Sequence, residues 1–218
     1  AGTPLNMVDQ GVLWLPLGDA LSQHPELLKR YFMQSESIFG SAKFTELHKS
    51  RVQTGTFLYV PKGVHIQAPL QAFHWVSGTG HAISPHTLIV AEEDSSLTFI
   101  DWFGSDGQGR NIACGTHDLH IGKKARIQYV SVQNWSRQSA ALHSNTTHIE
   151  AGGQALHLGL HLGGGFARSE SVSRLLGAGA RSEMLAATVA DADQEFDQRT
   201  LQDHRSADTH SDLLYKNA

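Results

Sequence analysis

Histidine is unusually frequent among the side chains that could do chemistry: the 218 residues include 14 histidines and a single cysteine, Cys114. Four of the histidines follow one another closely: His65, His74, His81 and His86. Imidazoles from neighbouring strands, joined by a carboxylate, form the metal site of a cupin jelly roll. That site needs a tight His-x-His pair followed shortly by Glu, and Glu92 and Glu93 stand at a poor distance for it. The pattern favours scattered strand histidines, and a cupin-like metal-binding enzyme stays an alternative.

A second pair, His157 and His161, lies four residues apart in "HLGLHLGGG" and therefore on one face of a strand. The other face is made of leucines: Leu156, Leu158, Leu160 and Leu162. A strand whose leucines point into the core and whose histidines point to solvent is typical of a solvated solenoid face. We therefore expect Leu156, Leu158 and Leu160 to be buried, each contributing about 1.5–3 kcal/mol.

The stretch Gln128–Ser136, "QYVSVQNWS", alternates as a half-buried strand does and then ends in two amides and an indole. These are Gln133, Asn134 and Trp135, which all carry hydrogen-bonding groups. The residues alone predict a structural hydrogen-bond network that closes the strand.

Catalytic motifs are missing from the sequence. It contains no Gly-x-Ser-x-Gly elbow, no P-loop and no dinucleotide fingerprint. Cys114, in "RNIACGTHDLH", is expected to be a small buried residue rather than a nucleophile. A β-helix protein that acts on polysaccharide is a further alternative and would expose aromatics such as Trp75 and Trp102. The chain is otherwise expected not to be an enzyme.

The composition excludes several classes of partner. The formal net charge is -4 without a basic run, which argues against nucleic acid. No apolar run approaches the roughly 18 residues of a membrane helix, and the N-terminus lacks a signal-peptide pattern. One cysteine allows no internal disulfide and fits a reducing cytoplasm, and it cannot supply the several thiolates that usually hold an iron–sulfur cluster.

The chain divides into two regions with different residue patterns. We expect residues 1–52 to form a helical N-terminal segment, with one helix in "DALSQHPELLKRYF" capped by Ser22 and a shorter one in "SAKFTELHKS". Residues 53–218 are expected to form a β core, because short β-rich runs alternate with glycine turns. Similar turn-and-strand segments begin at Ala91, Ile121, Ile149 and Leu176. The nearly regular spacing of these four starting residues favours a β-solenoid over a jelly roll. The core is expected to be incomplete at its C-terminal end.

Several strings together resemble the SufB/SufD family, the scaffold proteins of the SUF iron–sulfur cluster assembly system. They include "GVLWLPLGDALSQHPELLKRYF", "GTFLYVPKGVHIQAPLQ", "YVSVQNWS" and the closing "FDQRTLQDHRSADTHSDLLYKNA". They cover nearly the whole chain in the family's order. The resemblance implies a mainly β fold, a right-handed parallel β-helix preceded by a short α-helical segment.

Within the family the chain resembles the SufD side. Trp102 and Phe103 stand where SufB-type proteins place a cluster-related cysteine, and the ending with Arg199 and His204 is SufD-like. In SufB-type members, the residues matching Gln133 and Trp135 are thought to line a passage for sulfur inside the β-helix. The resemblance therefore leaves two roles open for "QNW", an internal passage or a structural network.

The resemblance also implies partners and cargo. It predicts a SufD-like scaffold subunit that works with a SufB-like protein and a SufC-like ABC-type ATPase, or self-associates, to build clusters and pass them to apo-proteins. ATP hydrolysis would belong to the SufC-like partner. We expect no metal site in this chain, and an iron–sulfur cluster only in the full complex.

Overall fold

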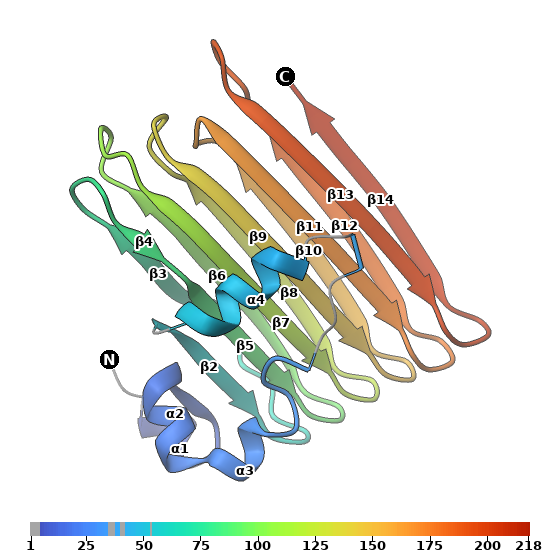
Figure 1. Ribbon diagram of the computed structural model, residues 1–218. Coiled ribbons are helices and arrows are strands. Elements are labelled where there is room, and N and C mark those ends of the chain that lie inside the picture. The colour runs from blue at the N-terminus through green and yellow to red at the C-terminus, as the bar shows by residue number, and fades with distance from the viewer. Residues whose placement is uncertain (1–4, 35–37, 40–41, 53) are drawn as a thin grey trace.

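The computed structural model describes residues 5–34, 38–39, 42–52 and 54–218 as two stacked parallel β-sheets with a short N-terminal helical segment on one of them (Figure 1). The helices are α1 (Leu5–Val8), α2 (Leu17–Gln23), α3 (Pro25–Leu28) and α4 (Ala42–Arg51).

The chain alternates between the two sheets, so that successive coils stack along one axis. Sheet A has the order β1 (Leu13–Pro16), β2 (Thr54–Val60), β5 (Pro85–Ala91), β7 (Ile112–Ile121), β9 (Ala140–Ile149), β11 (Phe166–Leu175) and β13 (Glu195–His204), with β4 (Ala82–Ile83) beside β7. Sheet B has the order β14 (His210–Asn217), β12 (Arg181–Thr188), β10 (Gln154–His161), β8 (Arg126–Asn134), β6 (Ser96–Ser105) and β3 (Leu70–Val76). All pairs are parallel except β1 with β2. The predicted β-solenoid is confirmed, and the antiparallel jelly roll is wrong.

The predicted repeat corresponds to the turns that lead from sheet A to sheet B. Each of these turns contains one residue with a left-handed backbone: Gly63, Asp94, Lys124, Gly152, Gly179 and Asp208. Backbone hydrogen bonds join neighbouring turns, as from the Asp94 N–H to the Lys123 carbonyl at 2.8 Å. Glycine and aspartate accept this conformation more readily than most residues. The glycine-rich repeat therefore marks the corner of each coil.

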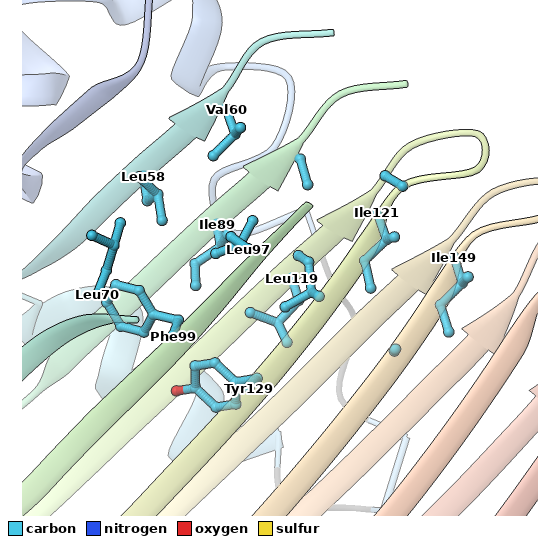
Figure 2. Close-up of a cluster of buried hydrophobic side chains, with 14 of the residues drawn as sticks. Leu58, Val60, Leu70, Ile89, Leu97, Phe99, Leu119, Ile121, Tyr129 and Ile149 are labelled. Atoms are coloured by element: carbon cyan, nitrogen blue, oxygen red, sulfur yellow. The ribbon is translucent and has the colours of Figure 1, made fainter. Parts of the chain in front are cut away.

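The core lies between the sheets and is apolar near these corners (Figure 2). Leu58, Ile89 and Leu119 stand in register on sheet A. Opposite them, the rings of Phe99 and Tyr129 are parallel, with centroids 6.2 Å apart. These side chains are fully buried or nearly so. Burial of such a stacked column stabilises the coils by about 1.5–3 kcal/mol per large side chain.

The N-terminal segment covers the outer face of sheet A. Leu17 and Leu28 from the helices pack on Phe57, Leu88 and Val90, which point away from the solenoid interior. β1 adds an edge strand here that the sequence did not suggest.

The helix predicted in "DALSQHPELLKRYF" is split in two. Its second half starts at Pro25, and Pro disfavours helical geometry in the preceding residue; His24 accordingly leaves the helix with φ -132° and ψ 48°. Ser22 is not a cap: it lies inside α2 and donates to the Gly18 carbonyl. The second predicted helix is present as α4.

Candidate functional site

The interior of the solenoid becomes polar away from the corner turns. Strand alternation points Asp101 of β6, Tyr129 and Gln133 of β8, and His157 of β10 inward, and all four are buried. Sheet A contributes a further buried imidazole, His117. The interior thus contains a continuous set of hydrogen-bonding groups directly beside the apolar core.

The prediction that Leu156, Leu158 and Leu160 are buried with the histidines outside is wrong. His157 is in register with Tyr129 and points inward, whereas the three leucines are only partly buried on the outer face of sheet B. Leu158 lies between Val130 and Leu185 on that face. Leu160 likewise has apolar neighbours on both sides, whereas Leu156 lies between Gln128 and Glu183. Inside, tyrosine, serine and imidazole partners accommodate the histidine.

Asp101 is the centre of the polar interior. Thr87 donates its hydroxyl to Oδ2 of Asp101 at 2.6 Å, and Tyr129 donates to the same oxygen at 2.7 Å. Nε2 of His74 lies 3.0 Å from Oδ1. Burial, with the nearby Asp101 charge, raises the pKa of Tyr129 well above its usual value. Tyr129 therefore stays protonated and acts as a permanent donor to the carboxylate.

The other interior histidines are held neutral. Burial lowers the pKa of His117 well below its usual value, and lowers that of His143 and His157 to about 3. The His117 ring contacts Tyr129 and His157, with centroids 4.4 and 4.9 Å away. Ser131 Oγ lies 3.0 Å from Nε2 of His157. Neutral imidazoles can donate and accept hydrogen bonds without adding charge to the interior.

A small cavity lies among these groups. Its polar lining includes His117, Ser131, Gln133, His143, Asn145 and His161. Nε2 of His117 and of His143 are buried there without a hydrogen-bond partner among the described residues. The space open to the centre of a water molecule is ≈ 20 Å³, and a water needs about 10–15 Å³ by this measure. The cavity has room for an ordered water rather than for a substrate.

The "QNW" residues do not share one environment. Gln133 binds the next coil: its Oε1 accepts from the Gly163 N–H at 3.2 Å, and its Nε2 donates to the Gly163 carbonyl. Trp135 is buried against Phe103 and neighbouring alanines, whereas Asn134 is exposed. Gly163 fits tightly here, since a Cβ added to it would lie 2.3 Å from the Trp135 carbonyl oxygen.

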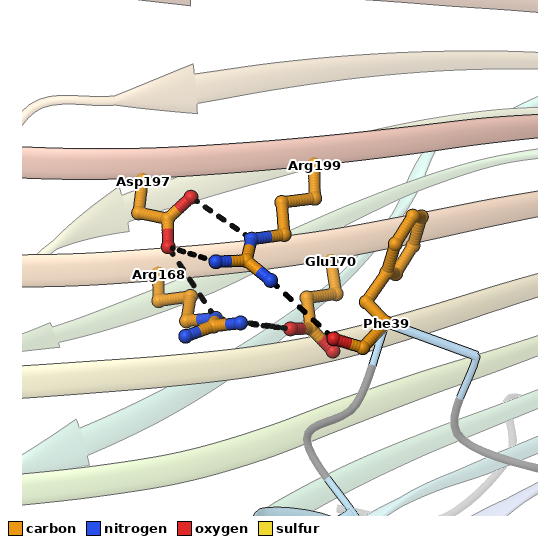
Figure 3. A network of polar contacts seen from close by, with 5 residues as sticks. All are labelled: Phe39, Arg168, Glu170, Asp197 and Arg199. Carbon is orange, nitrogen blue, oxygen red and sulfur yellow. Dashed lines mark hydrogen bonds and ion pairs between the residues drawn. The ribbon is translucent and has the colours of Figure 1, made fainter.

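Arg199 and His204 lie apart from this interior site. Arg199 points outward from β13, pairs with Asp197 at 3.2 Å and donates to the Phe39 carbonyl at 3.3 Å (Figure 3). His204, at the end of β13, contacts Thr209 and Ser211 through its two ring nitrogens, at 2.7 and 3.0 Å. Arg199 thus connects the solenoid to the N-terminal segment, and His204 joins the two sides of a corner turn.

The four histidines considered for a cupin site do not converge. His74 is interior, His86 lies under the helices, and His65 and His81 are exposed. Among the described residues, no three His, Cys, Asp or Glu side chains are grouped so as to hold a metal ion.

Cys114 is buried, and burial raises the pKa of its thiol to about 11. Trp75 and Trp102 are exposed on sheet B, where the Trp102 ring stacks on Phe73.

Comparison with known proteins identifies the family. A family model described as "SUF system FeS cluster assembly, SufBD core domain" matches residues 74–218, and one described as "SufBD protein N-terminal region" matches residues 2–72. This chain belongs to the SufBD family. The resemblance inferred from the sequence strings is therefore confirmed. The SufBD core domain match covers the solenoid from the end of β3 onward, whereas β2 and the start of β3 lie in the match to the N-terminal region.

Curated SufBD relatives agree with this assignment. The chain is 33% identical over 129 residues to "Iron-sulfur cluster assembly protein SufD" of Bacillus subtilis, a match covering 59% of this chain and 30% of that protein. It is 26% identical over 211 residues to an "Iron-sulfur cluster assembly SufBD family protein" of Staphylococcus haemolyticus, which covers 95% of this chain and 45% of that protein. The chain thus spans less than half the length of these relatives.

Proposed function

We propose that this SufBD chain forms the body of a SufD-like scaffold subunit in a SufB–SufC–SufD complex. The complex assembles iron–sulfur clusters in the cytoplasm and supports their transfer to apo-proteins. The observation that carries the proposal is the match of residues 74–218 to the SufBD core domain. The identity to a protein named SufD favours the SufD side.

The chemistry of the chain supports a scaffold rather than a catalyst. Its one thiol is buried with a pKa of about 11, so it presents little thiolate to receive sulfur near neutral pH. The cluster is the cargo of the complex, and its ligands would come from the assembled subunits. A SufC-like ATPase would supply ATP hydrolysis. In the described part of the chain, no helix is long and apolar enough to cross a membrane.

For Gln133 and Trp135 we favour a structural role. Three observations support it: the Gln133 amide binds the next coil at Gly163, the Trp135 ring is packed in an apolar cluster, and the adjoining cavity has room only for water. Widening of this cavity in the assembled complex would instead support the passage.

Co-purification tests membership of the complex. The complete open reading frame that contains this chain is co-expressed with the SufB-like and SufC-like proteins of the same source, with the affinity tag on the SufC-like protein. The proposal predicts that all three proteins elute together. A chain that elutes without these partners, with or without bound metal, contradicts it.

A further inference from the structure

The outer face of sheet B carries a continuous apolar surface. Helices α2 and α4 pack on strands of sheet A, on the other side of the solenoid (Figure 1). Strand alternation points two neighbouring rows of apolar side chains outward from sheet B, with one residue per strand in each row. The first row is Ile100, Val130, Leu158, Leu185 and Leu214, and the second row is Phe73, Trp102, Val132, Leu160 and Ala187.

Much of this surface is open to solvent. Phe73 is 67% exposed, and Trp75, which lies beside the second row, is 59% exposed. Single exposed apolar side chains are ordinary on a protein surface, whereas contiguous apolar patches of several hundred Å² mark interaction sites. With strands about 4.8 Å apart and outward residues about 6.6 Å apart along a strand, the two rows cover about 400 Å². The patch is therefore large enough to be an interaction surface.

Polar side chains border the two rows and complete the face. Gln128, Glu183 and Asp212 point outward on one side of the first row, and Asn134 follows the second row on the other side. With one such row on each side, the outer face of the six strands measures about 800 Å². Each partner buries about this area in a protein–protein interface of standard size, which has an apolar centre and a polar rim.

The second row is complementary to itself in size and charge. One end carries the Phe73 and Trp102 rings, which are stacked with centroids 5.9 Å apart. The other end carries the small Ala187 and, next to it on β14, Lys216. A two-fold axis parallel to the strands, between β8 and β10, would place β6 of one copy opposite β12 of the other, and β3 opposite β14. The Trp102 indole then meets Ala187, and the Lys216 ammonium can reach the Phe73 ring in a cation–π contact.

We propose that the outer face of sheet B packs on the same face of a second copy of this chain, in an isologous dimer. Two sheets that pack face to face lie about 10 Å apart with their strands within about 30° of each other. All six strands of each copy can therefore take part. The contact leaves sheet A and both ends of the solenoid free, so it is compatible with the complex proposed above and does not depend on it.

Sedimentation velocity of the purified chain tests the contact, from about 1 to 100 µM because interfaces of this size begin at micromolar affinity. Leu158→Lys places a charge at the centre of the first row. Leu21→Lys is the matched control, since it makes the same change at a 41% exposed leucine of α2, away from sheet B. The wild type and Leu21→Lys are expected to dimerise alike, and Leu158→Lys is expected to raise the dissociation constant at least about tenfold.

A wild type that stays monomeric over this range overturns the proposal. Dimerisation of Leu158→Lys with the wild-type dissociation constant also overturns it, because the contact would then lie elsewhere. A monomer that floats with phosphatidylcholine vesicles overturns it in favour of a membrane surface. Should circular dichroism show that Leu158→Lys does not fold, Trp102→Ser decides by the same criteria. It removes an exposed ring from the outer face, and with it the partner of Ala187 in the dimer.

Discussion

The two halves of the solenoid interior use the same backbone register but are stabilised differently. Near the corner turns, the Leu58–Ile89–Leu119 row faces Phe99 and is wholly apolar. Further along the same strands, Asp101, His117 and His157 face one another as a polar set. The apolar half depends on filled volume, whereas the polar half depends on each donor having an acceptor.

This difference shows how a parallel solenoid can bury many polar groups. A missing methylene in the apolar half leaves a cavity whose cost grows with its volume. A missing partner in the polar half leaves a buried donor or acceptor unsatisfied, at about 1–3 kcal/mol. The two halves are therefore expected to respond to different perturbations.

Acidification is expected to have the largest effect, and to act on the polar half. The pKa of His157 is about 3 in the folded protein, against about 6.5 when unfolded. The unfolded chain thus binds more protons, so stability is complete above about pH 6.5 and is lost as the pH falls toward 3, by about 1.4 kcal/mol per unit for each such histidine.

Urea unfolding between pH 7.5 and 5 measures this dependence. His157→Gln is the matched variant, since it keeps a hydrogen-bonding partner for Ser131 and removes one titrating group. It should show a smaller loss of stability on acidification than the wild type. Equal losses in the two proteins would argue against a neutral His157 as a source of the dependence.

Truncation of Phe99 tests the apolar half. Phe99→Ala is expected to lower the free energy of unfolding by about 3–5 kcal/mol, because the ring is fully buried against Tyr129. Phe73→Ala serves as the control: its ring is 67% exposed, and the change should stay within about 0.5 kcal/mol. Urea denaturation compares the two, and similar losses would contradict the assignment of inner and outer faces.

Removal of the Tyr129 hydroxyl isolates one bond of the polar half. Tyr129→Phe keeps the ring and deletes the donor to Asp101. The buried carboxylate keeps Thr87 as a donor, so the expected loss is about 1.5–3 kcal/mol, as for hydrogen bonds to charged groups. Thermal unfolding at pH 7.5 measures it, and an unchanged midpoint would show that the bond adds nothing to stability.

Substitution of Gly163 should have a smaller effect. This glycine lies against the "QNW" end of β8. A Cβ here would collide with the Trp135 backbone, so Gly163→Ala is expected to cost about 1–3 kcal/mol through local displacement. Gly107→Ala is the matched control, because its Cβ would meet no atom within 4 Å. Comparable unfolding midpoints in the two variants would refute the close approach of these coils.

Sequence periodicity predicted the solenoid, but it could not decide which face of β10 is buried. An alternation of leucine and histidine is equally compatible with buried leucines and with buried histidines. The choice depends on register, which places His157 beside Tyr129 inside and Leu158 beside Val130 outside. The contact between His48 of α4 and His86 of β5 was missed for a similar reason. The two residues come from separate elements, and no local pattern connects them.

Cluster transfer tests the central claim most directly. The proposed complex, purified after co-expression of the open reading frame that contains this chain with the SufB-like and SufC-like proteins of the same source, is supplied with iron, a sulfur source and ATP. Formation of a cluster on an apo-ferredoxin is followed by visible absorbance. The account predicts transfer that falls markedly when the SufD-like subunit is left out and returns when it is added back. Equal transfer with and without that subunit would contradict it.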